Sequence, residues 1–203
     1  MHAETLRDDA LKDLLNLMAN RGIENAAAGL GEMIGQRVAV EVADVSVAPI
    51  SSVPERLGGG EALVVGIYLA CDGTLGGHVM LIMELEEALR LVDLLLEQPE
   101  GTTQVLDGLA RSALAEAGNL TTAFFLNAVA GTLGLEGRPT PPAVIVDMAG
   151  AILDIMLVTA GELTDDILMM QAVFQGETRQ VKLQFWMVPD LDPLTEYLKS
   201  IST

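Results

Sequence analysis

Residues 103–134 read TQVLDGLARSALAEAGNLTTAFFLNAVAGTLG, a long alanine-rich segment. Its apolar side chains recur every three or four residues, a spacing that places them on one face of a helix. The positions that predict this buried face are Leu106, Ala110, Ala113, Ala117, Leu120, Phe124 and Ala128. Gly134 follows the last apolar residue, where a glycine commonly caps a helix. We therefore predict one helix from Thr103 to Leu133.

An earlier segment repeats this plan. Residues 4–34 show the same periodicity and are followed by Gly35. Aligning Asn20 with Asn119 places Gly35 on Gly134. The match predicts an internal duplication within one domain, since a solenoid would need more copies.

The remaining patterns alternate between strand and helix in both parts of the chain. The predicted strands are 37–42, 62–71, 77–83, 143–146, 167–174 and 180–188, and the predicted shorter helices are 85–96, 149–159 and 194–201, the last started by Pro193. We predict an α/β (α+β) fold with internal pseudo-two-fold symmetry, in which two long helices pack on one face of an antiparallel-type sheet. The chain, 1–203, is predicted to be a single domain with halves at about 4–98 and about 102–203.

The composition excludes several classes of protein. Half of the residues are hydrophobic, which excludes a disordered chain. The 29 acidic and 11 basic residues give a net charge of -18, which would repel nucleic acid and anionic membranes. The acidity suits a solvated surface, and it also suits a halophilic or acidic-proteome source. We predict no nucleic-acid partner.

Several features predict a cytoplasmic protein. Cys71 is the one cysteine, so no internal disulfide can form, and its place at the end of a strand favours a small core residue. Residues 1–7 lack the basic start of a signal peptide, and no run of about 18 uncharged apolar residues exists. We therefore predict no membrane insertion.

Three polar residues form a separate stripe on the second long helix. Ser112, Glu116 and Asn119 are spaced i, i+4 and i+7. Gly118 and Asn119 both lower helix propensity, so a purely structural helix would rarely place them at its middle. Glycine also allows another backbone to approach closely. A polar stripe is in most proteins only a solvated surface, and the asparagine could instead join two helices.

The sequence offers little other chemistry. His2 and His78 lie far apart, and no Cys/His/Asp spacing matches a metal site. Residues 58–60 are glycines without the Lys-Ser/Thr of a P-loop, and no Gly-x-Ser-x-Gly elbow exists. If the protein is an enzyme, we predict that it has no metal, cofactor or nucleophile of its own.

The stripe, with Pro141 beyond it, resembles the signature of the CheC/CheX/FliY family of response-regulator phosphatases. Residues 112–120 are similar to the second active-site helix of CheC, and 141–148 to the strand after it. Residues 20–27 resemble the equivalent segment of the first half, and Pro189-Asp190 with its short helix resembles the CheC ending. The resemblance covers nearly the whole chain.

The first half departs from the family pattern. Asp13 and Asn20 stand where the second half has Ser112 and Asn119, but Leu17 takes the place of the glutamate. Leucine cannot form an ion pair. We therefore predict a single-site variant whose first site, Asp13/Leu17/Asn20, is degenerate.

The resemblance implies a chemotaxis phosphatase that hydrolyses the phospho-aspartate of a CheY-like receiver domain. Asn119 would orient the attacking water and Glu116 would pair with the receiver's lysine. Ser112 and Pro141 would support them, Pro141 by ending the connection from helix to strand. The receiver would supply Mg²⁺.

The resemblance also leaves a second class of function open. Flagellar switch proteins such as FliM share this fold without the Glu-x-x-Asn pair, and CheC proteins also bind the deamidase CheD. A non-catalytic CheY- or CheD-binding adaptor is therefore the alternative. A CheX-like homodimer is a third option, although the internal duplication favours a monomer.

Overall fold

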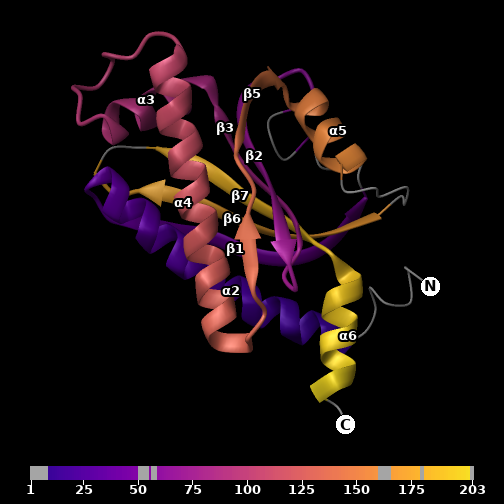
Figure 1. Cartoon of the computed structure of the whole chain (residues 1–203). Helices are drawn as coiled ribbons and strands as arrows, with labels where there is room; N and C mark the ends of the chain where they lie inside the picture. The colour runs from indigo at the N-terminus through magenta and orange to yellow at the C-terminus, as the bar shows by residue number, and fades with distance from the viewer. Residues whose placement is uncertain (1–8, 50–54, 56–58, 160–165, 179–180, 202–203) are drawn as a thin grey trace.

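The computed structural model describes residues 9–49, 55, 59–159, 166–178 and 181–201 (Figure 1). Helices and strands alternate in much the order that the patterns predict. In chain order they are α2 (Asp9–Ile34), β1 (Val38–Pro49), β2 (Leu63–Gly73), β3 (Gly77–Glu84), α3 (Leu85–Leu95), α4 (Gly108–Leu133), β4 (Gly137–Pro139), β5 (Ala143–Met148), α5 (Ala149–Thr159), β6 (Asp166–Gly176), β7 (Lys182–Pro189) and α6 (Leu191–Ile201).

The strands form one sheet in which every pairing among the described residues is antiparallel. The order is β1-β6-β7-β3-β2-β4, and β5 also pairs with β2. The hairpins β2–β3 and β6–β7 therefore meet at the centre of the sheet. Each outer strand, β1 or β5, pairs with the hairpin from the other part of the chain. This exchange ties the two parts of the chain into one sheet.

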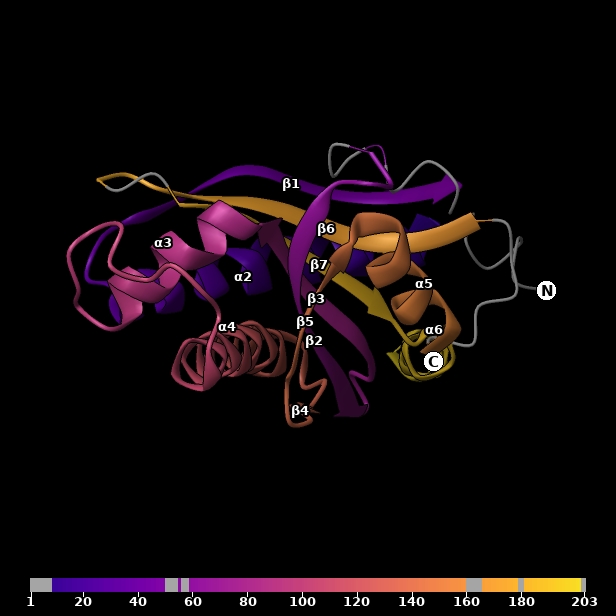
Figure 2. The same cartoon turned by 90° about the horizontal axis from the view of Figure 1, so that it is seen from above.

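Two apolar layers cover the two faces of the sheet. The larger core lies between the sheet and α2, α3 and α4. In it the Phe185 ring stacks on Phe174 and is tilted against Phe125. A smaller cluster around Trp186 and Ile152 fills the other face beneath α5. In Figure 2, α4 and α5 lie on opposite sides of β2 and β5. The predicted mixed fold, with both long helices on one face, is confirmed.

The two long helices correspond closely. Both contain 26 residues, and each is followed by a glycine with left-handed backbone, Gly35 at φ 65° and Gly134 at φ 71°. Where they pack, the Asn25 amide donates to the Phe124 carbonyl at 2.7 Å, across a sequence separation of 99. That separation equals the shift that aligns Gly35 with Gly134, as expected for helices that cross near a two-fold axis. The division into two halves remains an inference, which these matches support.

The other elements repeat in length as well. Strands β2 and β6 each have 11 residues, β3 and β7 each have 8, and α3 and α6 each have 11. Helix α5 and the short β4 have no counterpart among the described elements of the first part. They lie between the matching elements, so they leave the shared plan intact.

Several predicted boundaries are wrong. Helix α4 begins at Gly108, five residues after the predicted Thr103, and α6 begins at Leu191, so that Pro193 lies inside its first turn. Strand β1 runs on to Pro49, and β4 was not predicted. Residues 4–8 of the first predicted helix lie outside the described residues.

The buried face of α4 is also turned from its predicted position. Ala110 and Ala117 are buried as predicted, but Leu120 and Phe124 are only half-buried. The core is made instead by Leu114, Thr121, Thr122, Phe125, Leu126 and Val129. The helix packs against α2 as well as the sheet, so its buried surface is wider than one stripe. The positions of the apolar residues alone therefore do not show which direction the middle of the buried face points.

Candidate functional site

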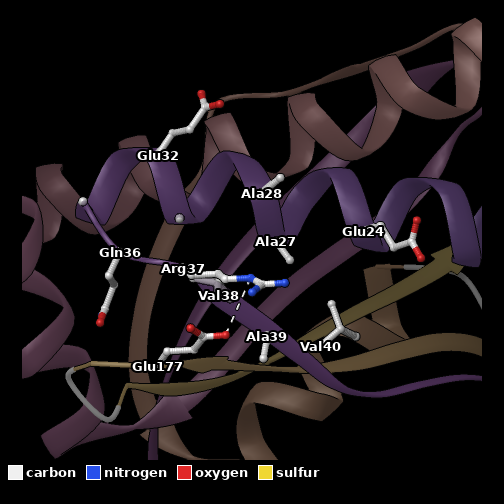
Figure 3. Close-up of a pocket in the computed structure, with 12 residues that line it drawn as sticks. Glu24, Ala27, Ala28, Glu32, Gln36, Arg37, Val38, Ala39, Val40 and Glu177 are labelled. Carbon is white, nitrogen blue, oxygen red and sulfur yellow. Dashed lines mark ion pairs between the residues drawn. The ribbon is translucent and has the colours of Figure 1, made fainter.

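A hollow of about 760 Å³ between α2 and β1 is one place to look for a site. Arg37 and Glu177 form an ion pair at its edge, with 3.6 Å between the Arg37 Nε and the carboxylate, and Glu32 points away from them (Figure 3). The Arg37 side chain is 82% exposed, so solvent screens this pair. No residue of the sequence motif lines the hollow. The predicted site therefore lies elsewhere on the molecule.

The predicted stripe lies on the solvent side of α4. Ser112 and Glu116 are exposed, and Asn119 is half-buried. Within the described part of the chain, none of these three side chains makes a hydrogen bond or an ion pair. Their polar groups are therefore available to a partner, and Asn119 does not join two helices.

Gly118 lies on the opposite, buried side of α4. A Cβ atom added there would come within 2.5 Å of the Ile67 Cγ2 atom on β2. Ile67 is itself fully buried and branched at Cβ, so it cannot easily move aside. Gly118 therefore lets α4 approach the sheet. The close approach that this glycine was expected to permit is thus made to β2 of the same protein.

Replacing Gly118 with alanine should therefore lower the free energy of unfolding, by about 2 kcal/mol, because the new methyl group overpacks the contact with Ile67. Urea denaturation would measure the change. Gly131→Ala on the same helix is the matched control, because a Cβ there meets nothing within 4 Å. The control should gain about 1 kcal/mol from helix propensity. Equal stability changes in the two variants would contradict the role of Gly118.

Two side chains set where α4 begins and how it meets β5. Asp107 caps the helix by accepting from the Ala110 backbone N–H at 2.9 Å. Arg111 donates through Nε to the Leu106 carbonyl and through Nη1 to the Val144 carbonyl, both at 3.1 Å. The sequence analysis missed Arg111. The sequence shows an arginine beside the motif, but it does not show that this side chain reaches the Val144 carbonyl, 33 residues away.

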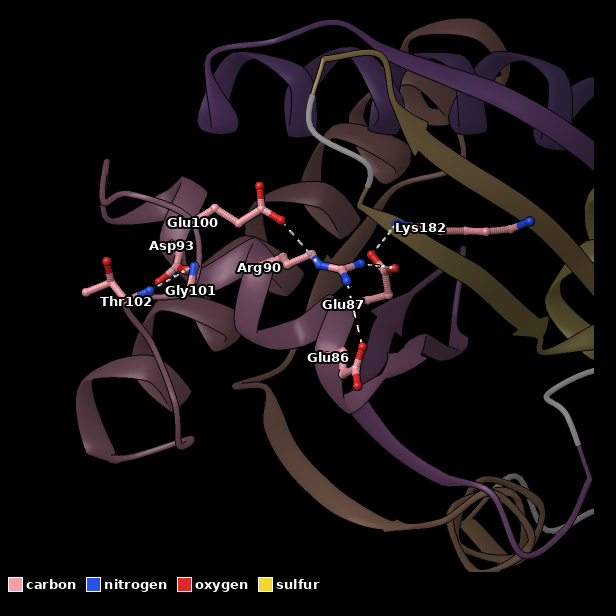
Figure 4. Close-up of polar contacts among 8 residues, drawn as sticks. All are labelled: Glu86, Glu87, Arg90, Asp93, Glu100, Gly101, Thr102 and Lys182. Atoms are coloured by element: carbon pink, nitrogen blue, oxygen red, sulfur yellow. Dashed lines mark hydrogen bonds and ion pairs between the residues drawn. The ribbon is translucent and has the colours of Figure 1, made fainter.

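The segment before α4 is fastened to α3 by one buried carboxylate. Asp93 is 1% exposed and accepts from the backbone N–H groups of Gly101 at 2.7 Å, Thr102 at 3.2 Å and Thr103 at 2.8 Å. Figure 4 shows the contacts with Gly101 and Thr102. These bonds fasten residues 101–103 to α3, and α4 begins only after the Asp107 cap.

A second contact ties the same segment to α3. Arg90 pairs with Glu87 at 2.8 Å and Glu86 at 3.7 Å, and reaches Glu100 at 3.6 Å (Figure 4). Glu87 in turn accepts from the Lys182 backbone N–H at the start of β7. The connection from α3 to α4 is thus anchored at several points.

The pKa of Asp93 lies below its ordinary value of 3.8. Burial opposes ionisation, but the hydrogen bonds from Thr103, Gly101 and Thr102 outweigh it. We expect Asp93→Ala to lower the free energy of unfolding by about 3 kcal/mol at pH 7 in urea denaturation. Because the folded-state pKa is depressed, this contribution should be present above pH 3.8 and disappear as the pH falls through the folded-state value.

Asp154→Ala, at an exposed position of α5, is the control for Asp93→Ala. Its stability should change by less than about 0.5 kcal/mol. The stabilisation is assigned to the ionised carboxylate of Asp93. A difference in unfolding free energy between wild type and Asp93→Ala that stays constant from pH 7 to pH 3 would contradict that assignment.

Pro141 lies between β4 and β5, both of which pair with β2. The preceding Thr140 donates its N–H to the Ala70 carbonyl at 2.8 Å, and its Oγ1 accepts from the Ala70 N–H at 3.1 Å. Proline has no N–H for a ladder, so it suits this interruption. The connection from α4 passes through the short β4, and Pro141 stands two residues before β5 begins, near the end of the connection to the predicted strand.

The predicted degenerate site lies on α2. Asp13, Leu17 and Asn20 are all exposed, with Leu17 exposed to 40%. Helix α2 therefore presents this set to solvent much as α4 presents its own stripe. An apolar side chain stands where α4 carries Glu116.

Other candidates for chemistry are weak among the described residues. They contain no group of three or more His, Cys, Asp or Glu side chains that could hold a metal ion. Burial raises the pKa of Cys71 to about 12, with Asp72 and Asp190 adding to the effect, so its thiol stays protonated. No helix in the described part of the chain is long and apolar enough to cross a membrane.

No family model matches the chain, but comparisons with curated proteins and with solved structures find similar ones. The CheY-P phosphatase CheC of Bacillus subtilis is 26% identical over 184 residues, covering 89% of this chain and 88% of that protein. FliY of Thermotoga maritima has the same fold, with a TM-score of 0.71 and 17% identity over 95% of this chain and 96% of that one. The chain is therefore similar in sequence to CheC over most of its length, and it shares the fold of FliY.

Two further solved structures share the fold. CheX from Borrelia burgdorferi, solved with CheY, BeF3 and Mg, matches with a TM-score of 0.51 and 15% identity over 84% of this chain and 96% of that one. The middle domain of FliM from Vibrio alginolyticus matches with a TM-score of 0.58 and 12% identity over 91% and 99%. Proteins with different names therefore share this fold, and the fold alone does not assign a function.

Proposed function

We propose that this protein is a phosphatase that hydrolyses the phospho-aspartate of a CheY-like receiver domain in chemotaxis signalling. The observation that carries the proposal is the pair Glu116 and Asn119, which α4 presents to solvent with no internal partner. The relative named as a CheY-P phosphatase and the CheX structure that contains CheY support the choice of substrate.

In the proposed mechanism Asn119 enters the receiver's phosphorylation pocket. Its carboxamide oxygen accepts from a water molecule and holds the water in line with the phosphorus. The water oxygen bonds to phosphorus as the bond to the aspartate oxygen breaks, so phosphate leaves and the receiver carboxylate is restored. The receiver supplies Mg²⁺, and this chain supplies position alone, which provides much of the catalysis in related phosphoryl transfers.

Glu116 has a separate role in binding. Its exposed carboxylate pairs with the receiver's lysine and so fixes how α4 lies over the pocket. Ser112, one turn earlier, supports the orientation of this face. Arg111 acts further back, by holding α4 against β5.

The experiment follows the dephosphorylation of a phosphorylated CheY-type receiver from the same organism, with and without this protein. We expect acceleration by the wild type and none by the double variant Glu116→Ala/Asn119→Ala. Binding without acceleration would overturn the phosphatase and favour an adaptor, with the receiver or CheD as its partner. Sedimentation of the free protein would test the expected monomer.

A further inference from the structure

The solvent side of α4 is unusually poor in charge for this protein. The chain carries 29 acidic residues and a net charge of -18, yet the 26 residues of α4 include two charged side chains, Arg111 and Glu116. Arg111 is bound to backbone carbonyls. Glu116 is thus left as the one charge of the helix without a partner, among the half-buried Ala113, Leu120 and Ala123. Depletion of charge at the centre is typical of protein–protein interfaces.

A large apolar side chain extends this face toward the start of the helix. Leu109 is 62% exposed, one of the most exposed large apolar side chains among the described residues. It precedes Ser112 by three residues and Glu116 by seven, so all three lie on one side of α4. Seven residues of helix place Leu109 about 10 Å along the axis from Glu116.

We propose that Leu109 is an apolar anchor that packs against the receiver domain beside the phosphorylation pocket, and this inference rests on the proposed function. The occupant follows from position and charge. Leu109 continues the Glu116–Asn119 stripe, which the proposed function assigns to the receiver. The receiver's pocket is acidic, so like-charge repulsion favours its approach to the part of this acidic protein that carries little charge. Burying an exposed leucine contributes binding free energy through apolar area.

Because Leu109 lies two turns from Glu116, it contacts the receiver and not the reacting atoms. It should therefore control affinity more than chemistry. Leu109→Ala should raise the Kd for a receiver loaded with BeF3 and Mg²⁺ about tenfold, in the range that interface anchors show. The KM for the phosphorylated receiver should rise by a similar factor, while kcat stays within about twofold.

Two variants serve as controls. Ile201→Ala removes a comparable side chain, 61% exposed, from the end of α6 and should leave Kd and KM unchanged. Leu109→Met keeps the apolar volume and should restore most of the affinity. Circular dichroism and thermal unfolding of each variant would show whether the fold is intact.

The outcomes separate this inference from the proposed function. Unchanged Kd and KM in Leu109→Ala, with an active wild type, would overturn the anchor and leave the phosphatase standing. A wild type that binds the BeF3-loaded receiver without hydrolysing the phosphorylated form would overturn the phosphatase. Weaker binding by Leu109→Ala would still support the anchor in that case. A wild type that does not bind would overturn both.

Discussion

Replacing Asn119 with alanine should lower the kcat of receiver dephosphorylation by about 100-fold or more, because the attacking water loses the group that orients it. The Kd for the BeF3-loaded receiver should change by less than about threefold, since the proposed ion pair of Glu116 remains. Single-turnover decay of the phosphorylated receiver would give the rate, and titration calorimetry would give the affinity. Stability should not fall, since alanine is the better helix former and Asn119 makes no side-chain hydrogen bond within the described chain.

Asn20→Ala is the matched control for this variant. Asn20 occupies the aligned position on α2, is exposed, and lies beside Leu17 instead of a glutamate. If the first site is degenerate, this variant should retain full activity. Normal kcat in Asn119→Ala would rule out the water-orienting role. A loss shared equally by both asparagine variants would instead mean that the first half is active.

Glu116→Lys should raise the Kd for the BeF3-loaded receiver by about 100-fold, because an attraction becomes a repulsion between like charges. Catalysis at low receiver concentration should fall with it, and excess receiver should restore part of the rate. The effect should weaken at high salt, which screens an exposed charge more than a buried one. Glu116 is exposed and unpaired within the described chain, so its replacement should leave stability nearly unchanged.

The substitution also changes the net charge, so the control must do the same. Glu196→Lys, on an exposed position of α6, alters the charge by the same amount away from α4. Its Kd should stay within about twofold of the wild type. Equal weakening by the two substitutions would mean that overall charge, and not an ion pair at Glu116, controls receiver binding.

Much of the candidate site could be predicted because it depends on local geometry. The spacing of Ser112, Glu116 and Asn119 places them on one side of a helix wherever that helix packs. Leu17 could be recognised as a departure in the same way. Leu109 lies on the same side by spacing, but its importance depends on the exposed fraction, which periodicity does not provide.

The supporting contacts could not be predicted, since each joins segments that are remote in sequence. The three N–H groups that meet Asp93, the carbonyl that meets Arg111, and the Ile67 side chain that meets Gly118 are brought together only by the fold. Gly118 shows the consequence most clearly. Its low helix propensity was visible, but whether it faces a partner or the sheet depends on how α4 is turned.

By itself the sequence determined the elements whose signals are local. Apolar periodicity predicted the long helices, and the glycines at 35 and 134 predicted where they end, because a left-handed residue costs glycine little. The tertiary structure alone decided that β1 pairs with β6 and β5 with β2, that Asp93 fastens the segment before α4, and which side of α4 meets solvent. The physical reason is that strand pairing and helix orientation depend on hydrogen bonds and packing between distant segments, which no local pattern specifies.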